Sequence, residues 1–288
     1  MVKSKFQMDD RMKKLWKRST DLSKNGKRNV YVDNAEFLVY HWSGHSAGFS
    51  PATGEMALAE DQRINLGDHN CRVDIGKAFP YADQMPSKTN GFEYSARNWA
   101  EDYVFFLDHS PAEVYPNETI AGEFHWQLDE ARKFVYPDEV VELGFDLRQK
   151  GAGGTSLAHT CPDLSIGLGK GWTGLLQDVR MSKEKWEKYG NTDRIEYLEA
   201  LEEVVKAIIR YTERHAEKAL ELAEKETDTE QKMRYEFVAA NMKQLAEGAP
   251  KTFVQAVQWI QLFQVAERIN GHGNGYGRLD LLLIDFYK

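Results

Sequence analysis

The most restrictive feature of the sequence is the run Phe253–Ile269, which is apolar nearly all the way round a helix. Thr252 stands where the N-cap of such a helix belongs. A helix that is apolar on every side is normally buried. The chain is therefore expected to fold around this segment, with other helices packed on it.

Helical periodicity also predicts the segments that surround this run. Asp193 is the expected N-cap of a long helix that ends at Thr227–Thr229 and has one apolar face. That face is Ile195, Leu198, Val205, Ile208, Thr212, Ala216, Ala219 and Ala223. A second helix runs to Ala246, where Gly248 and Pro250 end it, and its expected inward residues are Met233, Phe237, Ala240 and Leu245. An earlier helical period covers 94–107, with Trp99, Tyr103 and Phe106 on one side.

Four glutamines at steps of three mark the apolar helix: Gln255, Gln258, Gln261 and Gln264. They could bind a substrate through their amides. Buried amides more often hydrogen-bond to neighbouring backbone, because a buried polar group needs a partner. The structural interpretation is favoured.

Composition sets the broad class of the protein. In 288 residues, 42% are hydrophobic and 28% are charged, which indicates a soluble globular chain. The net charge of −8 argues against nucleic-acid binding. No stretch approaches the roughly 20 apolar residues of a membrane-spanning helix. With Cys71 and Cys161 as the two cysteines, a disulfide scaffold is excluded and a reducing cytoplasm is expected.

The first 28 residues carry ten Lys/Arg and three Asp, a local charge of +7. This could be a targeting or docking arm. A solvated helix over residues 8–22, with Met12, Leu15 and Trp16 facing inward, is favoured because no apolar targeting core follows. The first 110 residues otherwise read as an irregular N-terminal region.

A metal site is one hypothesis for the histidines. His41 and His45 are four residues apart, and Asp68–Cys71 could add ligands. Trp42-Ser43-Gly44 makes a helix between the two histidines doubtful, and no third ligand has a recognisable spacing. The expectation is that no metal binds.

The glycine-rich stretch Gly271–Gly277 resembles a phosphate loop but fails the dinucleotide pattern at Tyr276. It leads from the apolar helix into Leu279–Tyr287, an apolar run that is expected to be a strand. Glycines here would let the backbone approach a core element or a ligand closely.

A second glycine-rich turn, within Lys150–Asp163, leads to His159, with Thr160 as the expected N-cap and Pro162 in the first turn of a helix that runs to Met181. A polar side chain held on a loop by a rigid helix is a common site arrangement. A histidine that merely caps the helix is an equal alternative. Cys161 as a nucleophile would need a base and an orienting group, and His159 need not reach it.

Three blocks stand in order along the chain. They contain Asn117-Glu118-Thr119-Ile120-Ala121-Gly122, then His159-Thr160-Cys161-Pro162-Asp163, then Asn270-Gly271-His272 with Gly277-Arg278-Leu279-Asp280. In order and spacing these blocks resemble those of the glycyl radical enzymes, the pyruvate formate-lyase-like family, over about residues 95–288.

The resemblance implies an α/β fold that is predominantly helical, the N-terminal part of a ten-stranded α/β barrel. Residues 111–288 would form its helical layer and first barrel strand. The thiyl cysteine and the radical glycine of the family are absent from this chain, so no catalytic residue is assigned. The implied reaction is radical cleavage of a C–C, C–O or C–N bond in a small substrate, once a downstream segment is present.

The resemblance also implies a substrate wall made of His159, Thr160, Gly273, Asn274 and Gly275. In diol-dehydratase members the position of His159 holds a substrate hydroxyl, whereas Gly273 and Gly275 stand where those members have serines. No cofactor would bind to this chain.

The implied partners are the C-terminal portion of the enzyme, a radical-SAM activase and a second copy of the complete enzyme, in an oxygen-poor cytoplasm. The C-terminal run is expected to expose apolar surface in the isolated chain. The alternative is a non-catalytic binding module or pseudoenzyme subunit.

Overall fold

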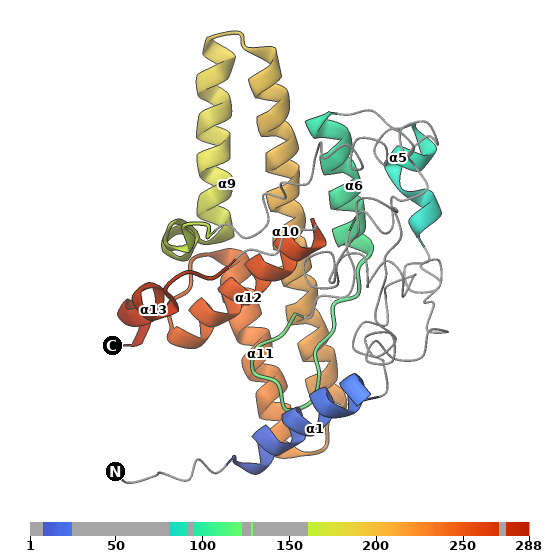
Figure 1. Cartoon of the computed structure of the whole chain (residues 1–288), viewed down its shortest axis with the longest axis vertical. Coiled ribbons are helices and arrows are strands. Elements are labelled where there is room, and N and C mark those ends of the chain that lie inside the picture. Colours follow the sequence, from blue (N-terminus) through green and yellow to red (C-terminus); the bar gives the residue numbers. More distant parts are fainter. Residues whose placement is uncertain are drawn as a thin grey trace, which may run out of the picture.

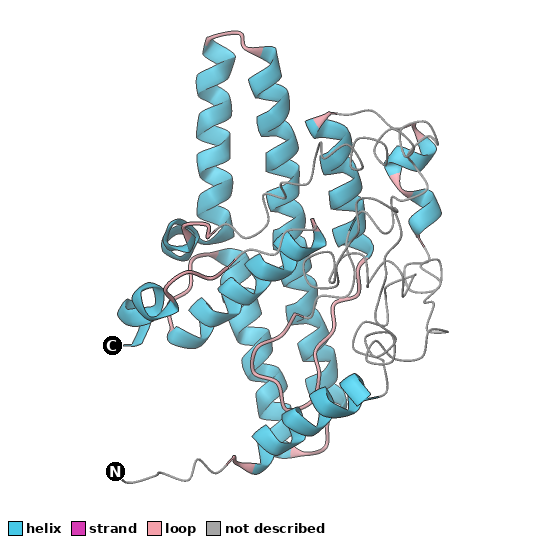
Figure 2. Cartoon of the chain, in the orientation of Figure 1, coloured by secondary structure: helices cyan, strands magenta, loops and turns pink. Residues whose placement is uncertain are grey.

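The computed structural model describes residues 8–24, 81–91, 95–122, 128, 161–270 and 275–287. These residues form helices joined by turns, with no strand among them (Figures 1 and 2). The helices are α1 (Asp10–Lys24), the 3₁₀ turn η2 (Ala82–Gln84), α5 (Pro86–Thr89), α6 (Ala96–His109), α9 (Leu164–Lys188), α10 (Thr192–Lys225), α11 (Thr229–Glu247), α12 (Phe253–Ile269) and α13 (Leu279–Tyr287).

The long helix α10 is the spine of the structure, because α6, α9 and α11 all pack against it (Figure 1). Its predicted apolar face is confirmed from Val205 to Ala223, where the residues are buried. The N-cap is Asn191, whose side chain accepts a hydrogen bond from the Arg194 amide at 3.0 Å. The prediction of Asp193 as the cap is wrong by two residues, since Asp193 lies in the first turn.

Two arginines of α10 fix the C-terminal end of α6. The Arg214 guanidinium donates to the carbonyl oxygens of Ser110, at 2.7 Å, and of Leu107. Arg210 forms a two-point ion pair with Asp108, at 3.0 and 2.7 Å. These cations satisfy the carbonyls at a helix C-terminus and complement its dipole. The predicted helix over 94–107 is confirmed, with Tyr103 and Phe106 buried.

Helix α11 buries a different face from the one predicted. Tyr235, Val238 and Met242 are buried together with Leu245, whereas Met233 and Phe237 are 56% and 43% exposed. Ala240 is also exposed. The helix has two apolar stripes on opposite sides, and helical spacing cannot tell which of them packs against α10. Of the four predicted residues, only Leu245 is buried.

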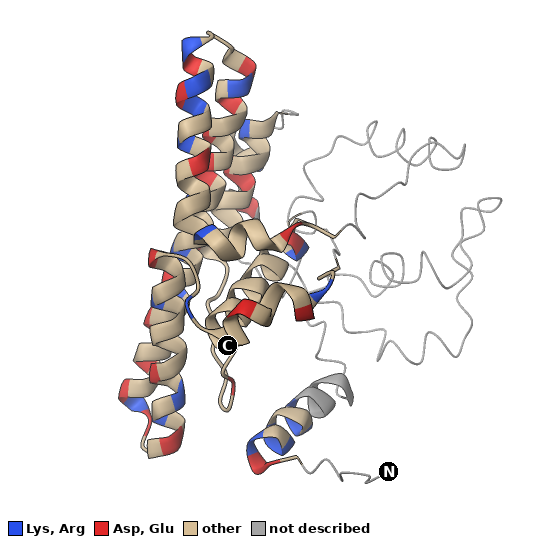
Figure 3. Ribbon diagram, turned by 90° about the vertical axis from the view of Figure 1, so that its left-hand side faces the viewer, with Lys and Arg blue, Asp and Glu red and all other residues tan. Residues whose placement is uncertain are grey.

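Helix α12 has the predicted bounds and the predicted cap, Thr252, whose hydroxyl accepts a hydrogen bond from the Gln255 amide at 3.3 Å. Trp259, Leu262 and Val265 are almost fully buried. α12 crosses the middle of the molecule, between the α9–α10 hairpin and the α10–α11 hairpin (Figure 1). Figure 3 shows charged residues gathered toward the far ends of those hairpins.

The prediction of a strand over Leu279–Tyr287 is wrong, since these residues form helix α13. Leu282, Leu283 and Phe286 pack on the core at helical spacing. The described neighbour of this run is α12, whose backbone is already hydrogen-bonded within its own helix, so a strand here would lack a partner. The expected exposed apolar surface is present on the outer face, where Leu281 is 61% exposed.

Helix α1 confirms the predicted N-terminal helix but not its orientation. Trp16 is 67% exposed and Met12 is exposed, while Leu15 is half-buried. The helix is held instead by one edge, where Arg18 pairs with Glu118 at 2.8 Å and lies over the Tyr115 ring. The described polar contacts of the helix lie at this edge, where Arg11 also donates to the Asn117 carbonyl, and they leave Trp16 and Met12 exposed.

No helix in the described ranges is long and apolar enough to cross a membrane. No three His, Cys, Asp or Glu side chains in the same ranges are grouped closely enough to hold a metal ion. His41, His45 and Asp68–Cys71 lie outside the described residues.

A buried carboxylate joins α9 to α10. Glu202 is 7% exposed, and its oxygens accept hydrogen bonds from Arg180, Lys183 and Lys206 at 3.0, 3.1 and 3.0 Å. Burial acts to raise the pKa of Glu202, but the bonds from these cations outweigh it and hold the pKa at about 2. The carboxylate therefore stays ionised in the folded chain far into the acidic range.

This pKa predicts a pH-dependent stability. Because the folded pKa of Glu202 is about 2 and the ordinary value is 4.5, its contribution is present above pH 4.5 and is lost as the pH falls toward 2. Glu202→Gln is expected to lower the free energy of unfolding at pH 7 by about 1–3 kcal/mol. Urea unfolding at pH 7 and pH 3 measures the change.

The matched control is Glu203→Gln, since Glu203 is the next residue and its side chain is exposed. It is expected to change stability by less than about 0.5 kcal/mol. Equal losses for the two variants at pH 7, or a loss for Glu202→Gln that is as large at pH 3 as at pH 7, would contradict the prediction.

Candidate functional site

The expected substrate residues fall largely outside the described part of the chain. His159, Thr160, Gly273 and Asn274 lie outside it, whereas Gly275 is described and half-buried. Cys161 is exposed, with its thiol not in a disulfide. The structure therefore bears on this site through the helices that hold the chain on either side of these residues.

The helix after His159 begins later than predicted. Asp163 is its cap, since Asp163 Oδ1 accepts hydrogen bonds from the Ser165 amide at 3.1 Å and from the Ser165 hydroxyl at 2.5 Å. The predictions of Thr160 as N-cap and of Pro162 in the first turn are wrong. A carboxylate accepts from the free amides of a first turn as well as a hydroxyl does, and sequence spacing alone does not choose between them.

The first turns of α9 are fixed on α12. A Cβ atom added to Gly167 would lie 2.0 and 2.3 Å from the Cη2 and Cζ2 atoms of Trp259, so the bare glycine lies directly on the indole ring. Leu164 and Leu168 are buried beside it. The Trp172 ring stacks on Trp259 with 4.7 Å between ring centroids. This contact places the chain that follows His159 against the middle of α12.

A kink at Gly171 separates these first turns from the rest of α9. Its φ of +64° and ψ of 178° are non-helical. A Cβ at this position would lie 2.6 Å from the carbonyl carbon of Gly248, so the backbone before α12 is in contact with the kink. Only glycine combines a positive φ with so close an approach. The kink sets the angle at which the first turns of α9 meet α12.

Ala121 and Gly122, which end the first of the three sequence blocks, are also fixed on α12. Gln258 accepts a hydrogen bond from the Ala121 amide at 2.8 Å and donates one to the Ala121 carbonyl at 2.7 Å. Gln261 donates to the carbonyl of Gly122 at 2.8 Å. Gln255 binds the Lys251 amide and Asn241. The structural interpretation of these three glutamines is confirmed.

The glycine-rich stretch follows α12 directly. α12 ends at Ile269, Asn270 is its cap, and the described chain resumes at Gly275 and enters α13 after Gly277, whose φ is +65°. α13 returns along α12, so that Tyr287 meets Phe253 edge to face at 6.1 Å between ring centroids. One helix thus supports both segments in which the expected substrate residues lie.

Two titratable groups have shifted pKa values, Tyr103 beside the end of α12 and Asp280 at the start of α13. Burial raises the pKa of Tyr103, whose hydroxyl donates to the Ala266 carbonyl at 2.8 Å. The Arg278 guanidinium holds the pKa of Asp280 at about 2 through a hydrogen bond at the start of α13. At neutral pH Tyr103 is therefore a neutral hydrogen-bond donor and Asp280 an ionised partner of Arg278.

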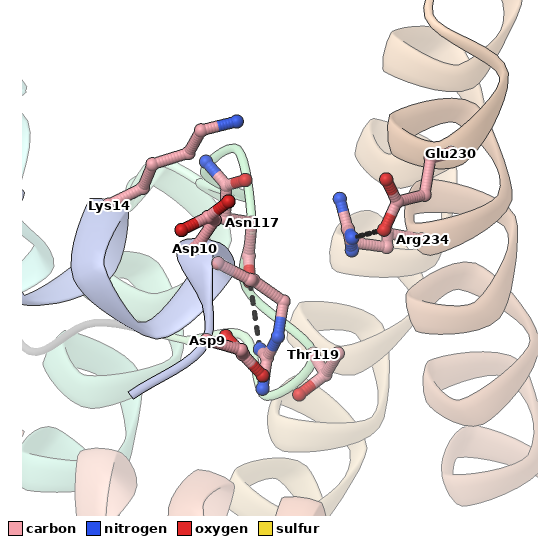
Figure 4. A pocket seen from close by; sticks show the side chains of 8 residues that line it. Asp9, Asp10, Lys14, Asn117, Thr119, Glu230 and Arg234 are labelled. Carbon is pink, nitrogen blue, oxygen red and sulfur yellow. Dashed lines mark hydrogen bonds and ion pairs between the residues drawn. The ribbon is translucent and has the colours of Figure 1, made fainter. Parts of the chain in front are cut away.

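A polar hollow of about 490 Å³, which sequence reasoning did not find, lies between α1, the turn at Asn117 and α11 (Figure 4). Figure 4 shows Glu230 paired with Arg234 on one wall and Asn117 on the other. The backbone carbonyl of Asn117 accepts a hydrogen bond from Arg11 at 3.1 Å. Three carboxylates (Asp9, Asp10 and Glu230) and three cations (Arg11, Lys14 and Arg234) line it, so their formal charges balance. The hollow therefore presents no concentrated charge to a ligand.

Comparison with known proteins places this geometry in a family. A family model described as pyruvate formate lyase-like matches residues 94–288. The chain belongs to the pyruvate formate lyase-like family. The residues matched by the family model include α12 and both segments that α12 supports.

The fold is also similar to that of a solved structure. The helices of this chain align with a glycyl radical enzyme from Archaeoglobus fulgidus at a TM-score of 0.59 and 19% identity, over 74% of this chain and 34% of that one. The predicted fold class is confirmed.

The relatives of this family member that have curated names are dehydratases and lyases. The (2S)-3-sulfopropanediol dehydratase of Klebsiella oxytoca is 33% identical over 222 residues, which are 66% of this chain and 25% of that protein. The isethionate sulfite-lyase of Nitratidesulfovibrio vulgaris is 38% identical over 101 residues, 34% of this chain and 12% of that protein. The chain spans about a quarter of the length of the first of these relatives.

The contact between Gly167 and Trp259 makes a direct prediction. Gly167→Ala forces a methyl group into the indole ring and is expected to lower the free energy of unfolding by about 1–3 kcal/mol. Trp259→Leu in the same chain is expected to reduce this penalty, because the two changes are coupled. Thermal and urea unfolding of the two single variants and the double variant measure the coupling.

Gly169→Ala is the matched control, since a Cβ there meets nothing within 4 Å on the same turns of α9. It is expected to be neutral or to stabilise by up to about 1 kcal/mol through helix propensity. If Gly167→Ala behaves like Gly169→Ala, the first turns of α9 do not lie on Trp259.

Proposed function

We propose that this chain is the N-terminal part of a glycyl radical dehydratase or lyase that cleaves a C–C, C–O or C–N bond of a small hydroxylated substrate. The observation that carries the proposal is the family match over residues 94–288, which includes α12 and both segments fixed to it. The names of the two relatives support the reaction class, since one is named as a dehydratase and the other as a lyase.

In this proposal the chain supplies one wall of the substrate pocket. His159 and Thr160 form it from the segment before α9, and Gly273, Asn274 and Gly275 form it from the segment after α12. A neutral imidazole can donate or accept a hydrogen bond, so His159 suits a substrate hydroxyl. Two glycines in the second segment leave room for a substituent larger than a hydroxyl.

The radical chemistry comes from outside this chain. A downstream segment provides the thiyl cysteine and the radical glycine, and a radical-SAM activase installs the radical. The complete enzyme is a homodimer in an anaerobic cytoplasm. The exposed face of α13, with Leu281 and Ile284, suits packing against the downstream segment, because exposed apolar surface of this kind usually marks an interface.

The test is anaerobic co-expression of the complete protein with an activase, followed by electron paramagnetic resonance. A doublet from a carbon-centred glycyl radical is expected, with turnover of (2S)-3-sulfopropanediol or isethionate as the first probes. A folded complete protein with a competent activase that gives neither radical nor turnover would contradict the proposal.

The role of His159 is tested by His159→Leu in the same preparation. The proposal gives His159 a contact with the substrate and none with the radical residues, so the radical signal is expected to persist while kcat/KM falls by at least about tenfold through the lost hydrogen bond to the substrate. Cys161→Ser is the control, since Cys161 is exposed and two residues away. Equal kcat/KM for the two variants would remove His159 from the pocket.

A further inference from the structure

Helix α5 ends at the dipeptide Asn90-Gly91, in which both residues are exposed. Asn90 is the C-cap, and its backbone N–H donates to the Pro86 carbonyl at 2.8 Å. Gly91 follows with a φ of +87°, in the left-handed region where many helices end. A Cβ atom added to Gly91 would meet nothing within 4 Å. The side-chain amide of Asn90 and the backbone nitrogen of Gly91 therefore lie next to each other in open space at the surface.

An asparagine that precedes a glycine contains an internal nucleophile. Once it has lost its proton, the backbone nitrogen of Gly91 can attack Cγ of Asn90, because this closes a five-membered ring. A bond forms between that nitrogen and Cγ, the bond between Cγ and the side-chain nitrogen breaks, and ammonia leaves. Water then opens the succinimide at one of its two carbonyls. One opening gives aspartate at position 90, and the other gives isoaspartate, in which the main chain runs through the side-chain carbonyl.

The local structure leaves this reaction unhindered. The ring closes by rotation about the ψ bond of Asn90, which stands at −2°. Gly91 has no side chain to block the approach, and its N–H donates no backbone hydrogen bond within the described residues. Asn98 and Asn241 are different, because they are buried inside α6 and α11 and the residue after each is held in the helical hydrogen-bond ladder. The chain exposes at position 90 a group that it protects at those two positions.

We propose that Asn90 is a site of spontaneous deamidation, at which the folded protein converts to aspartate and isoaspartate with water as the co-reactant. Each conversion adds one negative charge to a chain whose net charge is −8. The change lies three residues after Ser87, whose N–H donates to the buried carboxylate of Asp102 at 2.9 Å and so joins α5 to α6. Modified molecules accumulate with time and differ from new ones beside this contact. The inference goes beyond the proposed function and does not depend on it.

The experiment follows the amide group by mass spectrometry of tryptic peptides. The folded 288-residue chain is incubated at pH 8 and at pH 6, and samples are digested at intervals. Trypsin cleaves after Lys and Arg, so Asn90 is recovered in residues 89–97 and Asn191 in residues 189–194. A sample digested without incubation gives the conversion caused by digestion itself. Because other Asn-Gly pairs stand at 25–26, 270–271 and 274–275, conversion is read from each peptide and not from the charge of the whole chain.

Asn191 is the matched control for Asn90. It also flanks a helix, but a threonine follows it and its side chain accepts a hydrogen bond from the Arg194 amide at 3.0 Å. Asn90 is expected to convert at least about tenfold faster than Asn191, which corresponds to about 1.4 kcal/mol of activation free energy. Both the aspartate and the isoaspartate form of peptide 89–97 are expected. The rate rises from pH 6 to pH 8, because the deprotonated nitrogen is the nucleophile.

Two variants test the mechanism. Gly91→Ala keeps Asn90 but places a methyl group beside the nucleophile, and it is expected to slow the conversion by at least about tenfold. The new Cβ enters open space, so the contacts of α5 are kept. Asn90→Gln keeps an amide whose ring would have six members, and it is expected to abolish the conversion in peptide 89–97. This second variant carries the test if the positive φ at position 91 makes Gly91→Ala unstable.

The synthetic peptide 89–97 shows what the fold contributes. The folded chain is expected to convert at a rate within about tenfold of this peptide, because Asn90 is exposed. A rate at least about a hundredfold below that of the peptide would show that the fold protects the amide, and it overturns the proposal. Conversion at Asn90 that is no faster than at Asn191, or that is equally fast in Gly91→Ala, overturns it too.

Discussion

The rest of the structure depends on the contact between the Trp259 ring and the backbone of Gly167. It joins α12, the most buried helix, to the first turns of α9, and no residue with a side chain could stand at position 167 without displacing the ring. The same helix holds Ala121 and Gly122 through Gln258 and Gln261. α12 therefore joins two segments that lie far apart in the sequence, residues 121–122 and the first turns of α9.

Much of the helical frame could be predicted from the sequence. The bounds of α12 and the apolar faces of α6 and α10 follow from spacing, because long periodic segments leave few alternatives. The buried face of α11 could not be predicted, since Met233 and Phe237 fit a helical stripe as well as Tyr235 and Val238 do. The neighbour of a helix, which spacing does not identify, decides between two such stripes.

The errors at the site have a similar origin. Leu279–Tyr287 is apolar enough for a buried strand or a helix, and the choice depends on whether another backbone lies beside it. The start of α9 depends on whether Thr160 or Asp163 meets the first free amides, which is a matter of geometry. The structural role of Gln258 and Gln261 was predicted, because a buried amide usually has a partner, but their partners, Ala121 and Gly122, lie more than 130 residues away. The prediction is not confirmed for Gln264, which is buried and whose Nε2 has no hydrogen-bond partner in the described part of the chain.

Hydrogen exchange of the backbone amides tests the central claim, that α12 is the common support, most directly. Residues 119–122 and the first turns of α9 are expected to be protected to the same free energy as α12 and to lose protection together with it as denaturant is added, because they form one cooperative unit. Rapid exchange at 119–122, or at 164–170, while α12 stays protected would show that these segments do not depend on α12.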